Sequence, residues 1–98
     1  MSYNITVTWT RPSVDIPWFD FAAYPDGVAV TQAAKDAGKL TVTRTPSEDG
    51  LTLTSELSYD MEDTFSEIKL NPKVREMWAA RDAYNREHGI TQTIAIAE

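Results

Sequence analysis

Residues 40–59 read LTVTRTPSEDGLTLTSELSY, and the fold follows from this stretch. On each side of its centre, apolar and polar side chains alternate with a period of two, which is typical of β-strands with one buried face. The centre, Pro46-Ser47-Glu48-Asp49-Gly50, is a turn signal, because proline presets φ and Asp-Gly supplies the positive φ of a tight connection. The stretch therefore predicts a β-hairpin.

Two further strands are predicted towards the ends of the chain. Residues 3–11 alternate apolar side chains with threonine until Pro12 stops the pattern, and residues 90–96 alternate isoleucine with threonine and alanine. With the hairpin they make four strands. We expect their apolar side chains to pack under the helices: Ile5, Val7, Trp9, Leu40, Val42, Leu51, Leu53, Leu57, Ile90, Ile94 and Ile96.

A first helix is predicted over residues 28–37, between the first strand and the hairpin. Four small apolar residues recur there at helical spacing and form a narrow apolar stripe. Asp26 is the expected N-cap of this helix, and Gly38 stands where a helix commonly ends.

A second helical region follows the hairpin and is broken in two. Asp60 is the expected cap of a first segment that extends to about Ile68. Asn71-Pro72 then predicts the N-cap and first residue of a longer helix, because proline is tolerated there and disfavours helix in the residue before it. Gly89 is expected to end the longer helix.

The order of elements is strand, helix, strand, strand, helix, strand. A strand–helix–strand unit crosses over right-handed and leaves a gap for one strand, which the hairpin fills. We therefore predict an α+β domain over residues 1–98. Its architecture would be a βαββαβ ferredoxin-like sandwich, a four-stranded antiparallel sheet with the helices on one face.

The opposite parity of the predicted sheet is dominated by threonine. Two interpretations stay open, a solvated face or a surface that meets its copy in a homodimer, because a weakly charged sheet face is otherwise little protected against association. We call this surface the threonine face, and it comprises Thr6, Thr8, Thr10, Thr41, Thr43, Thr45, Thr52, Thr54, Thr91 and Thr93.

Composition excludes several classes of function. The 98-residue chain has a formal net charge of −6, which argues against a nucleic-acid partner, and no apolar run is long enough to span a membrane. There is no cysteine and one histidine, so we expect no metal site, and no cofactor-binding motif is present. Residues 1–5 lack signal-peptide features, so we expect a cytoplasmic protein.

The connection over residues 12–27 is long and rich in aromatic side chains. Trp18, Phe19, Phe21 and Tyr24 crowd between two prolines that are expected to bracket one short helix. These rings either plug the end of the core or form a partner anchor or pocket lid, since exposed aromatic side chains are favoured at interfaces. We call residues 12–27 the aromatic loop.

Three residues outside this loop are candidates for a ligand or partner surface. Arg44 has the parity of the buried sheet face, so its guanidinium must find a carboxylate or lie at a sheet edge. Arg81 falls with Trp78 on the inner stripe of its helix, so its guanidinium also needs a carboxylate partner. The only histidine, His88, lies in a last helical turn, where a structural role is favoured over catalysis.

The order of elements and the run through Leu51, Tyr59, Phe65, Asn71-Pro72, Val74 and Tyr84 resemble the dimeric α+β-barrel superfamily, over roughly residues 39–98. Its members include antibiotic-biosynthesis monooxygenase-like proteins. The resemblance implies a homodimer formed through the open sheet face, and no family site residue matches here. Residues 9–12 and 17–19 look similar to small marine bacteriophage proteins, which implies a virion or accessory role and a location in the virion or host cytoplasm.

Two hypotheses for function follow. The preferred one is a small non-catalytic oligomeric binding or structural module, phage-encoded if the second resemblance holds. The alternative is a cofactor-independent monooxygenase-like enzyme acting on an aromatic small molecule. A cavity of about 300 Å³ or more, lined by Trp, Tyr and Arg, would favour the enzyme. A filled core with exposed Trp18 and Phe19 would favour the module.

Overall fold

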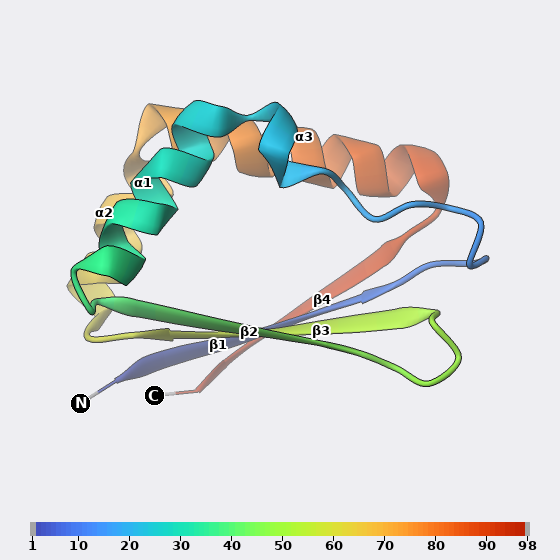
Figure 1. Cartoon of the computed structure of the whole chain (residues 1–98), viewed down its shortest axis with the longest axis horizontal. Coiled ribbons are helices and arrows are strands. Elements are labelled where there is room, and N and C mark those ends of the chain that lie inside the picture. The colour runs from blue at the N-terminus through green and yellow to red at the C-terminus, as the bar shows by residue number, and fades with distance from the viewer. Residues whose placement is uncertain (1, 98) are drawn as a thin grey trace.

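A computed structural model describes residues 2–97 of the chain. A four-stranded antiparallel sheet in the order β2-β3-β1-β4 carries all of the helices on one side (Figure 1). This is the predicted ferredoxin-like arrangement. The elements are β1 (Tyr3–Thr10), a short 3-10 helix η1 (Phe21–Ala23), α1 (Pro25–Asp36), β2 (Leu40–Pro46), β3 (Thr52–Tyr59), α2 (Glu62–Leu70), α3 (Pro72–His88) and β4 (Thr91–Ala97).

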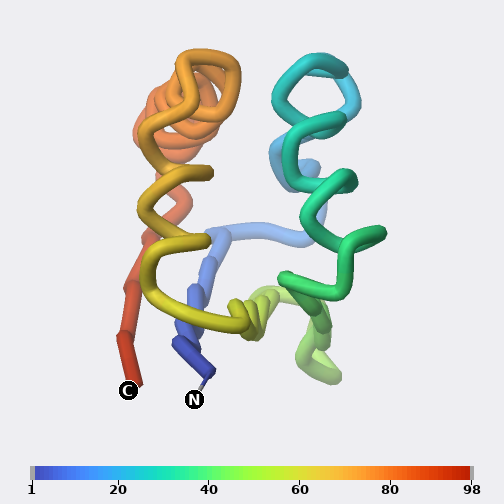
Figure 2. The backbone as a smooth tube through the Cα atoms, turned by 90° about the vertical axis from the view of Figure 1, so that its left-hand side faces the viewer, coloured from blue at the N-terminus to red at the C-terminus, as the bar shows by residue number. Residues whose placement is uncertain are grey.

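The helices form two columns above the sheet. Figure 2 shows α1 in one column, and α2 followed by α3 in the other. The columns touch where Gly27 of α1 faces Met77 of α3, because a Cβ at Gly27 would lie only 2.9 Å from the Met77 sulfur. No helix within residues 2–97 is long and apolar enough to cross a membrane.

Strand register sorts the helix-facing side of the sheet into rows. Val7 pairs with Ser55 on β3 and with Ile94 on β4, and Ser55 pairs in turn with Arg44 on β2. Side chains paired in this way share a face. The core lies on this side, and its buried apolar residues are Tyr3, Ile5, Val7, Trp9, Leu40, Tyr59, Ile68, Val74, Met77 and Ile90.

The predicted helix boundaries hold in part. Asn71 caps α3 through a 2.9 Å hydrogen bond from the Lys73 amide, Pro72 is the first residue of that helix, and Gly89 ends it in a left-handed conformation. The prediction of Asp26 as a cap is wrong, because α1 begins at Pro25 and Tyr24 stands at its N-cap without a capping side chain. Proline suits this first position since it needs no amide hydrogen.

Asp60 was also wrongly predicted as a cap. The N-cap of α2 is Met61, which has no capping side chain, and Asp60 lies one residue earlier. The Asp60 carboxylate instead accepts a hydrogen bond from the Thr64 hydroxyl, one helical turn further on. Asp60 therefore ties the end of β3 to the first turn of α2.

One part of the predicted buried face is not buried. Ile94 and Ile96 point to the helix side of β4, yet each is 54% exposed. The reason is that β4 is an edge strand, which has a neighbouring strand on one side only. The space left there belongs to the cavity described next, which both isoleucines line.

Candidate ligand-binding cavity

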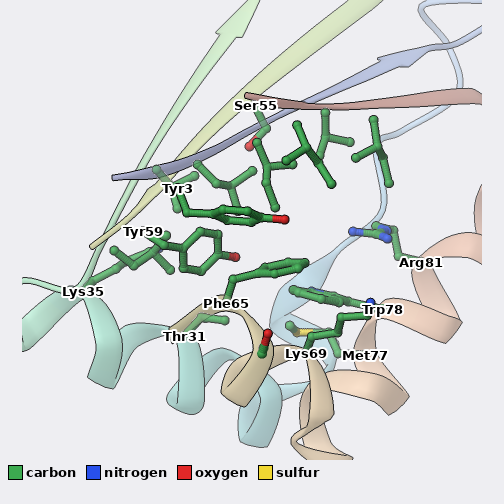
Figure 3. Close-up of a pocket in the computed structure, with 18 of the residues that line it drawn as sticks. Tyr3, Thr31, Lys35, Ser55, Tyr59, Phe65, Lys69, Met77, Trp78 and Arg81 are labelled. Atoms are coloured by element: carbon green, nitrogen blue, oxygen red, sulfur yellow. The ribbon is translucent and has the colours of Figure 1, made fainter. Parts of the chain in front are cut away.

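A cavity of about 480 Å³ separates the sheet from the helices. Its floor comes from all four strands and its roof from α1, α2 and α3, with side chains pointing inward from both layers (Figure 3). The lining includes the aromatic residues Tyr3, Trp9, Tyr59, Phe65 and Trp78, and the basic residues Lys35, Arg44, Lys69 and Arg81.

The floor is deepened by a serine where the strand pattern would place an apolar residue. Ser55 follows the inward parity of Leu53 and Leu57, and it is only 2% exposed. Its hydroxyl faces the cavity (Figure 3) and makes no hydrogen bond to any side chain or backbone group in residues 2–97. A small side chain at the centre of the floor leaves room, and its hydroxyl offers a polar contact to a ligand.

The roof nearest the start of β1 is an aromatic cluster around Phe65 of α2. The Tyr3 ring stacks on Phe65 and the Tyr59 ring meets it edge-on, each with ring centroids 5.3 Å apart. The Lys69 ammonium lies 5.7 Å from the centre of the Phe65 ring. Rings from three elements therefore form an aromatic wall of the cavity, against which an aromatic ligand could pack.

Tyr59 is a neutral polar group in this cluster. The residue is 1% exposed, and its hydroxyl makes no hydrogen bond within residues 2–97. Burial raises the pKa of Tyr59 to about 12, because the phenolate would be poorly solvated there. At neutral pH this phenol is therefore a hydrogen-bond donor or acceptor and not a base.

The two arginines predicted as site residues both reach the cavity, with different partners. Arg81 pairs with Asp82, at 3.0 Å from Nη2 and 3.1 Å from Nε to Oδ1, and its guanidinium carbon lies 5.6 Å from the centre of the Trp78 ring. Arg44 lies on the edge strand β2, with its guanidinium carbon 4.9 Å from the centre of the Phe21 ring. Loss of surrounding water lowers the pKa of Arg44 below its usual value.

The aromatic loop closes one end of the sandwich. The Phe19 ring lies at its centre, with ring centroids 5.0 Å from Phe21, 5.8 Å from Tyr24 and 5.8 Å from Tyr84 of α3. The Tyr84 hydroxyl also donates a hydrogen bond to the Pro17 carbonyl. As predicted, the loop holds one short helix.

Trp18 has a different partner: the guanidinium carbon of Arg11 lies 4.4 Å from the centre of the Trp18 ring. Trp18, Phe19, Phe21 and Tyr24 are all half-buried, which fits a plug better than an exposed anchor.

Sequence reasoning therefore found part of this cavity. Trp78, Arg81 and Arg44 line it, whereas Trp18, Phe19 and Phe21 line a much smaller hollow beside it, and Tyr24 lies outside both. Ser55 and Phe65 were missed. Ser55 could have been found, because it is the one polar side chain in the inward parity of the hairpin's return strand before Tyr59.

The remaining candidates for catalytic or metal-binding groups are the histidine and the acidic residues. His88 stacks on Tyr84 with ring centroids 4.1 Å apart, and its Nδ1 lies 2.9 Å from the Tyr84 carbonyl oxygen, so it supports α3 away from the cavity. Within residues 2–97, no cluster of three His, Asp or Glu side chains could hold a metal ion.

No protein-family model matches the chain, and no curated protein matches it at a significant level. Solved structures do match. A candidate antibiotic biosynthesis monooxygenase from Deinococcus radiodurans is 15% identical with a TM-score of 0.61, and the match covers 98% of this chain and 90% of that one. SnoaB, a cofactor-independent oxygenase from Streptomyces nogalater, is 15% identical with a TM-score of 0.54, over 99% and 91% of the two chains.

A dimeric protein of unknown function from Bacteroides fragilis, described as having a ferredoxin-like fold, also matches, with 9% identity and a TM-score of 0.51 over 98% of this chain and 95% of that one. At such low identity these likenesses show the fold alone. The chain has the α+β fold of the antibiotic biosynthesis monooxygenase-like dimeric barrel proteins, as its sequence resemblance predicted.

The buried Tyr59 phenol predicts a pH dependence of stability. The unfolded phenol ionises near pH 10 while the folded one keeps its proton to about pH 12, so the free energy of unfolding should fall as pH rises from 10 to 12. The loss should reach at most about 2 kcal/mol. Urea unfolding at pH 9, 10 and 11 should show a smaller fall in Tyr59→Phe than in the wild type; equal falls in both proteins would contradict the assignment.

Proposed function

We propose that this protein binds a flat, ring-bearing small molecule in the cavity between its sheet and its helices. The observation that carries the proposal is a cavity of about 480 Å³ with aromatic walls and with the Ser55 hydroxyl on its floor. Ligand pockets typically have volumes of about 300–1,000 Å³, mostly apolar walls and a few polar groups that fix orientation. This cavity has each of these properties.

This proposal reorders the two hypotheses drawn from the sequence. The cavity is larger than about 300 Å³ and is lined by Trp, Tyr and Arg, which favours the enzyme hypothesis and the small-molecule binding that an enzyme requires. The half-buried rings of Trp18 and Phe19 give little support to an aromatic anchor for a protein partner. Binding of a small molecule therefore comes first, and a purely structural module comes second.

Filling the cavity should abolish binding without unfolding the protein. Ser55→Phe places a ring in the middle of the floor, so the affinity for the neutral fluorescent probe N-phenyl-1-naphthylamine should fall at least about tenfold. The free energy of unfolding should fall by no more than about 1 kcal/mol, because the ring enters existing space. Fluorescence titration and urea unfolding measure the two quantities.

The matched control is Ala29→Phe, an equal addition at an exposed position of α1 outside the cavity lining. It should leave probe affinity unchanged. A wild-type protein that binds no ring-bearing probe, or equal affinities in Ser55→Phe and the wild type, would overturn the proposal.

A second candidate is cofactor-independent oxygenation of the bound aromatic molecule. It is supported by the cavity together with the fold shared with SnoaB, which is described as a cofactor-independent oxygenase. The described lining offers little acid–base chemistry, since its one carboxylate is Glu62 and it holds no histidine. The substrate would therefore have to supply an easily oxidised, electron-rich ring.

This candidate predicts oxygen uptake with dihydroxynaphthalenes in the presence of a metal chelator. An oxygen electrode should record a rate that is proportional to protein concentration and that Ser55→Phe removes. If uptake equals the protein-free rate for every such compound, the protein is a binder of these molecules and not an oxygenase for them.

We also propose a homodimer that forms through the threonine face. Thr8 lies near the centre of that face, paired with Thr54 on β3 and Thr93 on β4, and no helix covers this side of the sheet (Figure 1). The dimeric Bacteroides fragilis protein of the same fold supports the proposal. This face spans four strands and carries few charged side chains; Glu56 on β3 is one of them.

A lysine at the centre of this face should weaken the dimer. Thr8→Lys would place two ammonium groups in the shared interface, where each loses water without gaining a counter-ion. Sedimentation velocity should show the dimer dissociation constant rising at least about tenfold. Ala29→Lys is the control and should not change it. A wild-type protein that is monomeric at every concentration would refute the dimer.

The setting of this function is part of the same proposal. We propose that residues 1–98 act as one domain in a cytosol-like compartment, on a small molecule and not on nucleic acid. The absence of cysteine and the net charge of −6 support these points. Encoding by a phage stays a prediction from the sequence.

A further inference from the structure

Basic side chains gather around the cavity of an otherwise acidic protein. The chain has nine Lys and Arg residues against fifteen Asp and Glu residues, which makes its net charge −6. Four of the nine cations line the cavity, namely Lys35, Arg44, Lys69 and Arg81, and the only acid in the lining is Glu62. The local charge of the cavity is therefore opposite in sign to that of the whole molecule, and a concave site focuses such a field on its ligand.

Three of these four cations form no ion pair with the residues that the structure describes. Within residues 2–97 the ion pairs are Lys73–Asp26 and Arg81–Asp82, and only Arg81 belongs to the cavity. Arg44 contacts the face of the Phe21 ring and no carboxylate. The pKa of Arg44 is lowered because neighbouring groups displace part of its water, although the residue as a whole stays exposed. An anion at this position would provide the missing partner.

A serine hydroxyl lies at the strand position directly opposite Arg44. Arg44 and Ser55 are directly paired on neighbouring strands, and both side chains point to the helix side. Opposite residues of an antiparallel pair have Cβ atoms about 5 Å apart, so a rotation of the flexible Arg44 side chain could bring its guanidinium to an oxyanion held by Ser55. Ser55 is 2% exposed and its hydroxyl has no partner within residues 2–97. A guanidinium fork and a hydroxyl donor on neighbouring strands are groups that recognise a carboxylate.

The apolar part of such a ligand has its own surface. Phe65 and Trp78 lie on the roof across from the floor that carries Ser55 (Figure 3). A ring held between these layers would direct a carboxylate substituent towards the row of Arg44 and Ser55. Arg81, already paired with Asp82, would contribute at longer range.

We propose that the natural ligand is an aromatic carboxylate, whose ring packs under Phe65 and Trp78 and whose carboxylate binds Arg44 and the Ser55 hydroxyl. This inference rests on the proposed function and specifies the class of its ligand. The competing explanation is that these cations are ordinary solvated side chains at the rim of a cavity for neutral molecules.

The test compares 2-naphthoate with 2-naphthamide, which have similar shapes and differ in charge. Both are titrated at pH 7.5 by displacement of N-phenyl-1-naphthylamine. In the wild type, 2-naphthoate should bind at least about tenfold more tightly, as expected for a hydrogen-bonded charge pair. In Arg44→Met, which roughly keeps the length of the side chain, the ratio of the two affinities should fall to near one.

Two variants sharpen this result. Arg44→Lys keeps the charge but loses the planar fork, so it should retain part of the preference. Arg75→Met removes an exposed charge of α3 outside the cavity lining, and it should retain the full preference. Arg44 is an exposed residue of an edge strand, so the variants are expected to fold, and circular dichroism with thermal melting verifies this.

The outcomes separate the two levels of the proposal. Equal binding of both compounds by the wild type would overturn the carboxylate inference and leave the proposed function standing. Failure of both compounds and of the neutral probe to bind would overturn both. A preference that survives Arg44→Met would show that the carboxylate binds elsewhere, and it would overturn the assigned site.

Discussion

The pairing register between β1 and β3 is the constraint on which the rest of the structure depends. It sets Val7 opposite Ser55 and Trp9 opposite Leu53. The side chains of both central strands that carry this parity therefore share the face under the helices. A shift by one residue would turn this face to the other side of the sheet and bring threonine under the helices. The same register places Ser55 at the centre of the inner face, where its small size leaves space.

That space persists because the layers are held apart by large side chains at its margins. Phe65 stacks with Tyr3 and Tyr59 on one side, and the aromatic loop packs around Phe19 at the closed end. Between these two clusters the floor of the cavity carries the small side chain of Ser55. The cavity is thus a consequence of packing and not of a missing element, and its edge at β4 leaves Ile94 partly exposed.

The fold could be predicted almost completely from the sequence, and the site only in part. Strand alternation, the turn at residues 46–50 and the caps Asn71 and Gly89 are local signals, because each depends on a few neighbouring residues. The caps Asp26 and Asp60 were wrong, since an acidic residue near a helix start fits several positions of the first turn equally well.

By itself the sequence determined which residues form strands and helices and which side of each strand is apolar, because backbone chemistry and periodicity act over short distances. Only the tertiary structure decided that a cavity exists and that it is basic. Arg44, Ser55, Phe65 and Trp78 lie on four different elements, and their meeting depends on the separation of the two layers. That separation is set by packing among residues distant in the chain, which no local pattern encodes.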